Sequence, residues 1–152
     1  MKIIHTLIAT AFGAGFSPFA PGTAGAIVAC AILWLIEKLD LFTTYSISFI
    51  LLIIICTVLG VISTNYLEKH WGKDPSKVVM DEVIGMWITM IFVPFSYLNI
   101  LLAFILFRFF DITKPLGIRK LENFPGGIGV MADDVLAGIY ANIVLQLIIY
   151  FI

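Results

Sequence analysis

Long uncharged stretches alternate with short polar segments along the chain. Residues 3–36 carry no charge when His5 is neutral, and further uncharged runs cover Leu41–Leu67, Val83–Phe107 and Val135–Ile152. Charged residues gather instead in Glu68–Glu82 and Arg108–Asp134. A helix needs about 20 apolar residues to cross hydrocarbon, so Leu41–Leu67 predicts a membrane-spanning helix. We expect Val135–Ile152 to form another apolar helix.

The first uncharged stretch cannot be a single helix. Gly13–Gly22 is rich in glycine and proline, which break helices. We therefore expect a short helix over Ile3–Phe12, interfacial or re-entrant, and a second over Thr23–Ile36 that ends near Glu37-Lys38. No clean cleavage site follows the first apolar residues, so we expect the N-terminus to be retained.

The stretch Val83–Phe107 allows either one span kinked at Pro94 or a helical hairpin that turns within residues 92–99. In the hairpin, both polar segments lie on the side of the N-terminus. That side then holds eight of the nine basic residues, namely Lys2, Lys69, Lys73, Lys77, Arg108, Lys114, Arg119 and Lys120, and leaves Lys38 on the other. Basic residues favour the cytoplasmic side, so the charges favour the hairpin. Its arms are short for a full crossing, so they either extend into the flanks or stop partway.

Composition points to lipid as the solvent. The 152 residues are 61% hydrophobic and 12% charged, whereas soluble domains carry about 25% charged residues. The mean hydropathy is +1.09. A soluble chain of this size could not bury so much apolar surface. We predict an all-α, compact multi-helix membrane bundle formed as one domain over 1–152, with a polar active site at one face and no nucleic-acid partner.

Two acidic pairs, Asp81-Glu82 and Asp133-Asp134, each precede an apolar run. Acids are favourable in a first helical turn, which would be a purely structural role. The hairpin brings both pairs to one membrane face, where neighbouring carboxylates repel unless a cation neutralises them. Oxygen ligands favour Mg²⁺ or Mn²⁺ over zinc. We therefore predict a divalent-cation site formed by Asp81, Glu82, Asp133 and Asp134.

Between the acidic pairs, Arg108, Asp111 and Lys114 follow one another at intervals of three residues. On a helix they would share one face, and they could form a ladder of salt bridges. Alternatively, Arg108 and Lys114 bind phosphate oxygens while Asp111 contacts the metal or Lys114. We expect Pro115 to end this helix.

Two glycine- and proline-rich loops could complete a phosphate site. Ser17–Thr23 leads into a helix with Thr23 as its expected N-cap, and helix N-termini bind phosphate. Pro125–Gly129 precedes the second acidic pair. The candidate phosphate-binding residues are Ser17, Gly22, Thr23, Gly126 and Gly127. Neither loop matches a Walker A or dinucleotide-binding motif, and no Cys-x5-Arg loop or serine triad is present.

Four stretches, taken in order, resemble the bacterial phosphatidylglycerophosphatase A family. They are Phe12–Thr23 (FGAGFSPFAPGT), Met80–Thr89 (MDEVIGMWIT), Phe107–Pro115 (FRFFDITKP) and Gly126–Gly138 (GGIGVMADDVLAG). The resemblance implies a Mg²⁺-dependent enzyme of the inner membrane. Such an enzyme converts phosphatidylglycerophosphate to phosphatidylglycerol and inorganic phosphate.

The family's acidic positions match Asp81, Glu82, Asp111, Asp133 and Asp134, and its basic positions match Arg108 and Lys114. We accordingly expect Asp81, Asp111, Asp134 and Lys114 to act in catalysis and Arg108 to bind substrate, with one or two Mg²⁺ ions. Asp111 could be a base or a nucleophile. We expect a multi-pass protein in the bilayer whose site faces the cytoplasm. The alternatives are a small transporter or ion-binding module, whose charges would lie nearer the membrane midplane, and a purely structural membrane protein. The oligomeric state stays open.

Overall fold

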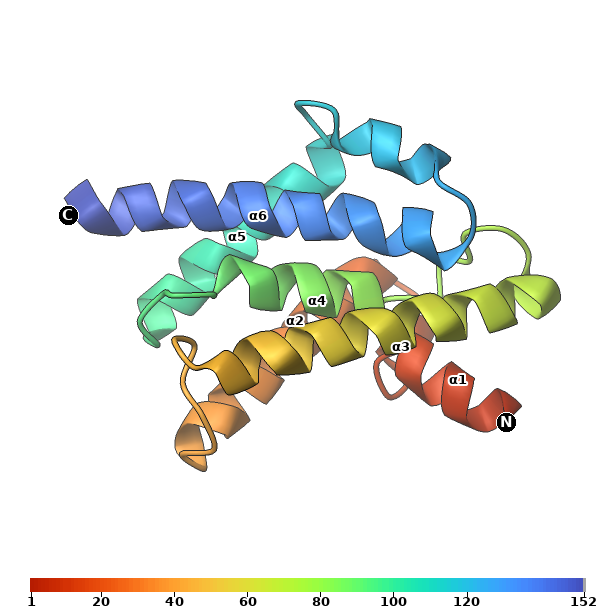
Figure 1. The fold of residues 1–152 in the computed structure, drawn as a ribbon, viewed down its shortest axis with the longest axis horizontal. Helices are drawn as coiled ribbons and strands as arrows, with labels where there is room; N and C mark the ends of the chain where they lie inside the picture. Colours follow the sequence, from red (N-terminus) through yellow and green to blue (C-terminus); the bar gives the residue numbers. More distant parts are fainter. Residues whose placement is uncertain (152) are drawn as a thin grey trace.

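The computed structural model describes residues 1–151 and folds them into helices and connecting turns, without a strand (Figure 1). This confirms the prediction of an all-α fold. Six α-helices and two short 3-10 helices follow one another as α1 (Lys2–Ala9), η1 (Ala14–Phe16), α2 (Pro21–Lys38), α3 (Ile47–Trp71), α4 (Met80–Thr89), α5 (Tyr97–Thr113), η2 (Ile118–Asn123) and α6 (Gly127–Phe151).

Three helices, α2, α3 and α6, are long and apolar enough to cross a membrane. Their outward faces carry large apolar side chains, as on α3, where Ile54, Ile55 and Val58 are exposed. An apolar surface of this extent is unfavourable in water and suits hydrocarbon. Helix α3 confirms the clearest predicted span, but it begins at Ile47, where the Ser46 hydroxyl accepts a hydrogen bond from Phe49 N–H at 3.2 Å.

The stretch Val83–Phe107 forms a hairpin, as its charges predicted. Helix α4 ends at Thr89, a turn covers residues 90–96, and α5 begins at Tyr97. In Figure 1 α4 runs away from the N-terminal end of the molecule and α5 returns towards it. Both polar segments therefore lie at the same end as the N-terminus, and the C-terminus lies at the other.

Helix α4 has ten residues and is surrounded by protein, so it ends partway along the bundle. Backbone groups at such a break need partners, because lipid offers none. The Asn142 amide of α6 donates to the carbonyls of Thr89 at 2.9 Å and Ile91 at 2.8 Å. Phe92 N–H donates to the Thr44 carbonyl at 3.1 Å. These bonds allow a half-length helix inside an apolar bundle.

Replacing Asn142 with leucine of similar size is expected to lower the free energy of unfolding by about 2 kcal/mol or more. Each buried carbonyl left without a donor costs about 1–3 kcal/mol. Unfolding in mixed micelles titrated with SDS would measure the loss. Gln146→Leu is the control, since its amide is exposed, lies 3.4 Å from the same Ile91 carbonyl and donates to Asn142 Oδ1 at 2.8 Å, so it removes a neighbour of Asn142 while the Asn142 amide itself remains. Equal effects of the two substitutions would contradict the role given to Asn142.

Two predicted helix starts are wrong. Helix α2 begins at Pro21 with Ala20 as its N-cap, so Thr23 lies inside the first turn and caps nothing. Proline is favoured at the first helical position because it lacks an N–H, and this was the better signal. Helix α6 begins at Gly127, so Asp133 and Asp134 lie about two turns into the helix instead of in its first turn.

Candidate functional site

Two glycines bring the acidic residues of α4 and α6 together. A Cβ atom on Gly138 would lie 2.5 Å from the Gly85 carbonyl oxygen, so the two helices cross in direct backbone contact. Gly85 follows Asp81 by four residues, and Gly138 follows Asp134 by four. The acids therefore lie one helical turn from the crossing, where the helices are still close.

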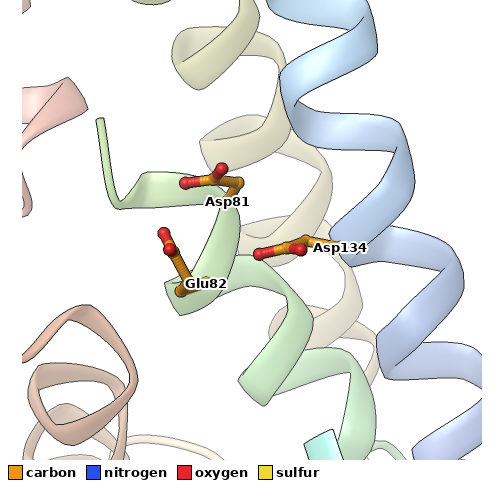
Figure 2. A group of neighbouring side chains, drawn as sticks. All are labelled: Asp81, Glu82 and Asp134. Atoms are coloured by element: carbon orange, nitrogen blue, oxygen red, sulfur yellow. The ribbon is translucent and has the colours of Figure 1, made fainter. Parts of the chain in front are cut away.

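Three carboxylates meet above this crossing. Asp81, Glu82 and Asp134 each offer an oxygen atom, and these atoms all lie within 4.8 Å of one another. Figure 2 shows Asp134 reaching from α6 towards the two acids of α4. Like charges at this separation repel strongly, so the cluster requires a proton or a cation to stabilise it.

The cluster fits a divalent cation by its donors. One oxygen of each acid, namely Asp81 Oδ1, Glu82 Oε2 and Asp134 Oδ2, is buried and has no hydrogen-bond partner among the described residues. Buried polar atoms almost always have partners, so unpaired oxygens that share one space indicate a missing ligand. All-oxygen sites suit Mg²⁺, Ca²⁺ or Mn²⁺.

Asp133 stands apart from the three-acid cluster and faces Lys114. Its Oδ2 accepts a hydrogen bond from Lys114 Nζ at 2.6 Å, and Glu122 Oε1 accepts a second one at 2.6 Å. Burial by itself lowers the pKa of Lys114, but the bonds to Asp133 and Glu122 outweigh it and raise the pKa above its ordinary value. The ammonium therefore stays charged at neutral pH.

Lys114 does not continue the face of α5. The helix ends at Thr113, and Lys114 follows as its C-cap in the left-handed region, with φ 45°. The shared face expected for Arg108, Asp111 and Lys114 is thus wrong for Lys114, which pairs with Asp133 across the site, so the alternative of a full salt-bridge ladder along α5 is not formed. The first step is present, because Arg108 forms an ion pair with Asp111.

These groups line one pocket of about 620 Å³, which is in the usual range for small-molecule sites. Asp81, Glu82, Asp133 and Asp134 line it together with Arg108, Asp111 and Lys114. Arg108 Nε is buried and has no partner in the described part of the chain, so the guanidinium keeps a donor available.

The two predicted loops contribute unequally. Gly22 and Gly126 line the pocket, whereas Ser17, Thr23 and Gly127 do not. A Cβ on Gly22 would meet Glu82 Oε1 and would lie 3.1 Å from Arg108 Nη1, so the α2 backbone approaches both side chains closely. Ser17 instead donates to the Phe19 carbonyl, and Gly127 N–H donates to Asn65 Oδ1 at 2.8 Å.

Several pocket residues were not predicted from the sequence. Glu122 holds Lys114 from η2, and the connection after α3 contributes Lys73, Asp74 and Ser76 to the pocket wall. These residues sit in ordinary polar connections, where no spacing distinguishes them. For the crossing glycines a signal existed, since each follows an acid by four residues in an apolar helix.

Comparisons with known proteins agree with the motifs. A family model described as Phosphatidylglycerophosphatase A matches residues 7–149. The chain is 50% identical over 148 residues to a protein of Bacteroides thetaiotaomicron named "Putative phosphatidylinositol-3-phosphatase", covering 95% of this chain and 92% of the relative.

Two further relatives are named Phosphatidylglycerophosphatase A. The Escherichia coli protein is 36% identical over 145 residues, which cover 93% of this chain and 81% of the relative. The Haemophilus influenzae protein is 40% identical over 157 residues, with 97% and 89% covered. No solved structure matches the chain. Because the family match spans nearly the whole sequence, the chain belongs to the phosphatidylglycerophosphatase A family of phosphatases.

Proposed function

We propose that this protein removes the terminal phosphate of phosphatidylglycerophosphate, giving phosphatidylglycerol and inorganic phosphate, and that it needs Mg²⁺. The observation that carries the proposal is the buried cluster of Asp81, Glu82 and Asp134, whose unpaired oxygens share a pocket with Arg108 and Lys114. Carboxylates for a cation beside bases for a phosphate are the groups that phosphoryl transfer uses. Two relatives carry the name of this activity.

In this proposal Asp81, Glu82 and Asp134 hold Mg²⁺. When bound, the ion supplies Lewis-acid stabilisation of charge on the phosphoryl group. Asp133 is left out of this ligand set because Lys114 occupies its Oδ2 and neither of its oxygens belongs to the three-acid cluster, although its Oδ1 is also buried and unpaired among the described residues.

Arg108 and Lys114 bind the phosphate oxygens and stabilise the negative charge that develops as the bond breaks. Asp111 orients the Arg108 guanidinium through their ion pair, and Asp133 with Glu122 orients Lys114. In this proposal Asp111 acts as a positioning residue instead of the base or nucleophile. Backbone N–H groups at the start of α2, beside Gly22, complete the anion site.

Hydrolysis joins a water oxygen to phosphorus and breaks the bond from phosphorus to the glycerol oxygen. The water gives a proton to a carboxylate of the cluster, and the leaving oxygen takes one up from solvent. The pocket is lined mainly by residues of the two polar segments, which hold most of the basic residues and lie at the same end of the bundle as the N-terminus (Figure 1), so we assign that end to the cytoplasmic face of a bacterial inner membrane.

A second candidate substrate is a phosphatidylinositol phosphate, because the 50% identical relative is named for the 3-phosphate of that lipid. Both lipids present a phosphate monoester on a polyol head group. The same metal cation and the same two basic side chains, Arg108 and Lys114, could bind the phosphate monoester of either lipid.

The test is phosphate release by the purified protein in neutral detergent, with each lipid separately, in Mg²⁺ and in EDTA. We expect release from phosphatidylglycerophosphate that needs Mg²⁺. Release from phosphatidylinositol 3-phosphate alone would replace the first substrate by the second. Equal phosphate release in Mg²⁺ and in EDTA would contradict the proposed requirement for Mg²⁺. No release from either lipid by folded protein would favour the ion-binding or transport alternative.

A further inference from the structure

The pocket is larger than a phosphate group needs, and its outer wall has a different composition from its inner end. The inner end is the less exposed part of the lining, formed by the carboxylate cluster, Arg108 and Lys114, whereas most residues of the outer wall are exposed. Lys73, Asp74 and Ser76, from the connection between α3 and α4, line the same pocket together with Asn123. This wall has one cation, the carboxylates of Glu68 and Asp74, and the polar side chains of Ser76 and Asn123, none of which the phosphatase chemistry uses.

Lys73 differs from the other two bases of the pocket. Arg108 is paired with Asp111, and Lys114 is held by Asp133 and Glu122. Among residues 1–151, no carboxylate lies within ion-pairing distance of the Lys73 ammonium, and the side chain is exposed. Its charge is therefore available to a ligand.

The position of Lys73 along the chain is well fixed. Gly72 has φ 89° and Asp74 has φ 48°, so the backbone turns sharply on both sides of Lys73. Glu68 Oε1, on the last turn of α3, accepts a hydrogen bond from Asp74 N–H at 3.1 Å and ties the turn to the helix. The lysine is thus presented from a folded turn at the pocket rim.

Lys73 lies near the end of a spanning helix, at the level expected for lipid head groups. Helix α3 ends at Trp71, two residues before Lys73, and the Lys77 ammonium lies 5.7 Å from the ring centres of both Trp71 and Phe16. Tryptophan and lysine at the end of a spanning helix mark the level of the lipid head groups. At this level a phospholipid carries the phosphodiester that joins its head group to its glycerol backbone.

We propose that Lys73 binds the phosphodiester of the lipid substrate and so selects phospholipids from other phosphate monoesters. The inference rests on the proposed function and adds a second anion site to it. Asp74, Ser76 and Asn123 then face the polyol between the two phosphates, whose hydroxyls both donate and accept hydrogen bonds. In this proposal the Lys73 ammonium pairs with the negative charge of the phosphodiester, which is separate from the charge of the reacting terminal phosphate.

The experiment separates the two phosphates. Phosphatidylglycerol keeps the diester and lacks the terminal phosphate, so its binding is measured by titration in neutral-detergent micelles. Glycerol 3-phosphate has a monoester and no diester, so its cleavage is measured with Mg²⁺. For Lys73→Gln we expect about tenfold weaker binding of phosphatidylglycerol, with cleavage of glycerol 3-phosphate unchanged.

Lys120→Gln is the matched control, because it removes the same charge from η2 at the same end of the bundle and does not line the pocket. It is expected to leave both measurements unchanged. Unaltered phosphatidylglycerol binding in Lys73→Gln would overturn the proposal, as would an equal loss of glycerol 3-phosphate cleavage. The binding measurement tests the role of Lys73 even if no lipid is hydrolysed. Failure of the Lys73 proposal can therefore be distinguished from failure of the proposed function.

Discussion

Replacing Asp134 with asparagine is expected to lower phosphate release by about 100-fold or more, with the fold retained. Removing a key charged group from a phosphoryl-transfer site costs on the order of 10² to 10⁴ in rate. Asp134 has 2% of its surface exposed and carries an unpaired oxygen in the three-acid cluster. Asparagine keeps the size but loses the charge, so the affinity for Mg²⁺ falls with the rate. Turnover and calorimetric titration with Mg²⁺ measure the two effects.

Asp133→Asn, at the adjacent position, separates the loss of a metal ligand from the loss of a partner for Lys114. Asp133 pairs with Lys114 at 2.6 Å and lies outside the three-acid cluster. Its loss is expected to slow turnover by weakening the hold on Lys114, while Mg²⁺ affinity changes little. Near-normal turnover in Asp134→Asn would remove the assigned site. Equal losses of Mg²⁺ affinity in both variants would instead restore Asp133 as a ligand, as the sequence alone predicted.

The second large effect is expected from Gly138→Ala. The added Cβ would lie 2.5 Å from the Gly85 carbonyl oxygen and 3.1 Å from its Cα, which are backbone atoms that cannot rotate away. Overpacking of this kind costs about 1–3 kcal/mol. The helices must also separate, which moves Asp134 away from Asp81. We expect a lower unfolding midpoint together with at least about tenfold weaker Mg²⁺ binding.

Gly60→Ala provides the control for an added methyl group in a neighbouring helix. Its Cβ would meet the Sδ and Cε atoms of Met131 at 3.0 and 3.1 Å. Methionine is flexible and can yield, so the effect on stability is expected to be small and Mg²⁺ binding to be retained. Unchanged Mg²⁺ affinity in Gly138→Ala would show that the crossing does not set the spacing of the acids.

Charge placement predicted the topology better than local sequence predicted the helix ends. The excess of basic residues on one side identified the hairpin, because it reflects a constraint on the whole chain. The ends depend on a few backbone groups. Gly127 looks like a loop residue, yet α6 begins there, and the Gly126 carbonyl just before it accepts hydrogen bonds from Gly129 N–H at 3.0 Å and Val130 N–H at 3.4 Å. The amide of Asn142 in an apolar run was the visible sign of the break after α4.

For the candidate site, residue types were predictable and their pairing was not. The acids and bases named from the sequence all line one pocket, but spacing alone put Lys114 on the face of α5. Pro115 disfavours the helical conformation at Lys114, which adopts the left-handed region instead, and its ammonium pairs with Asp133. The choice between Asp133 and Asp134 as cluster members depends on the rotation of α6 at the crossing, for which the only sequence signal is that Gly138 follows Asp134, and not Asp133, by four residues.

The outward apolar faces of α3 and α6 also determine how the protein meets its substrate. In the proposed function, a chain held in lipid by these helices searches for its substrate in two dimensions, from a pocket whose rim we place at the level of the head groups. The encounter rate then follows the mole fraction of substrate at the surface, and the amount of substrate per volume of solution has little influence. Neutral lipid or detergent added at constant total substrate lowers the mole fraction of substrate at the surface. We expect turnover to slow for this reason, without any inhibitor binding to the enzyme.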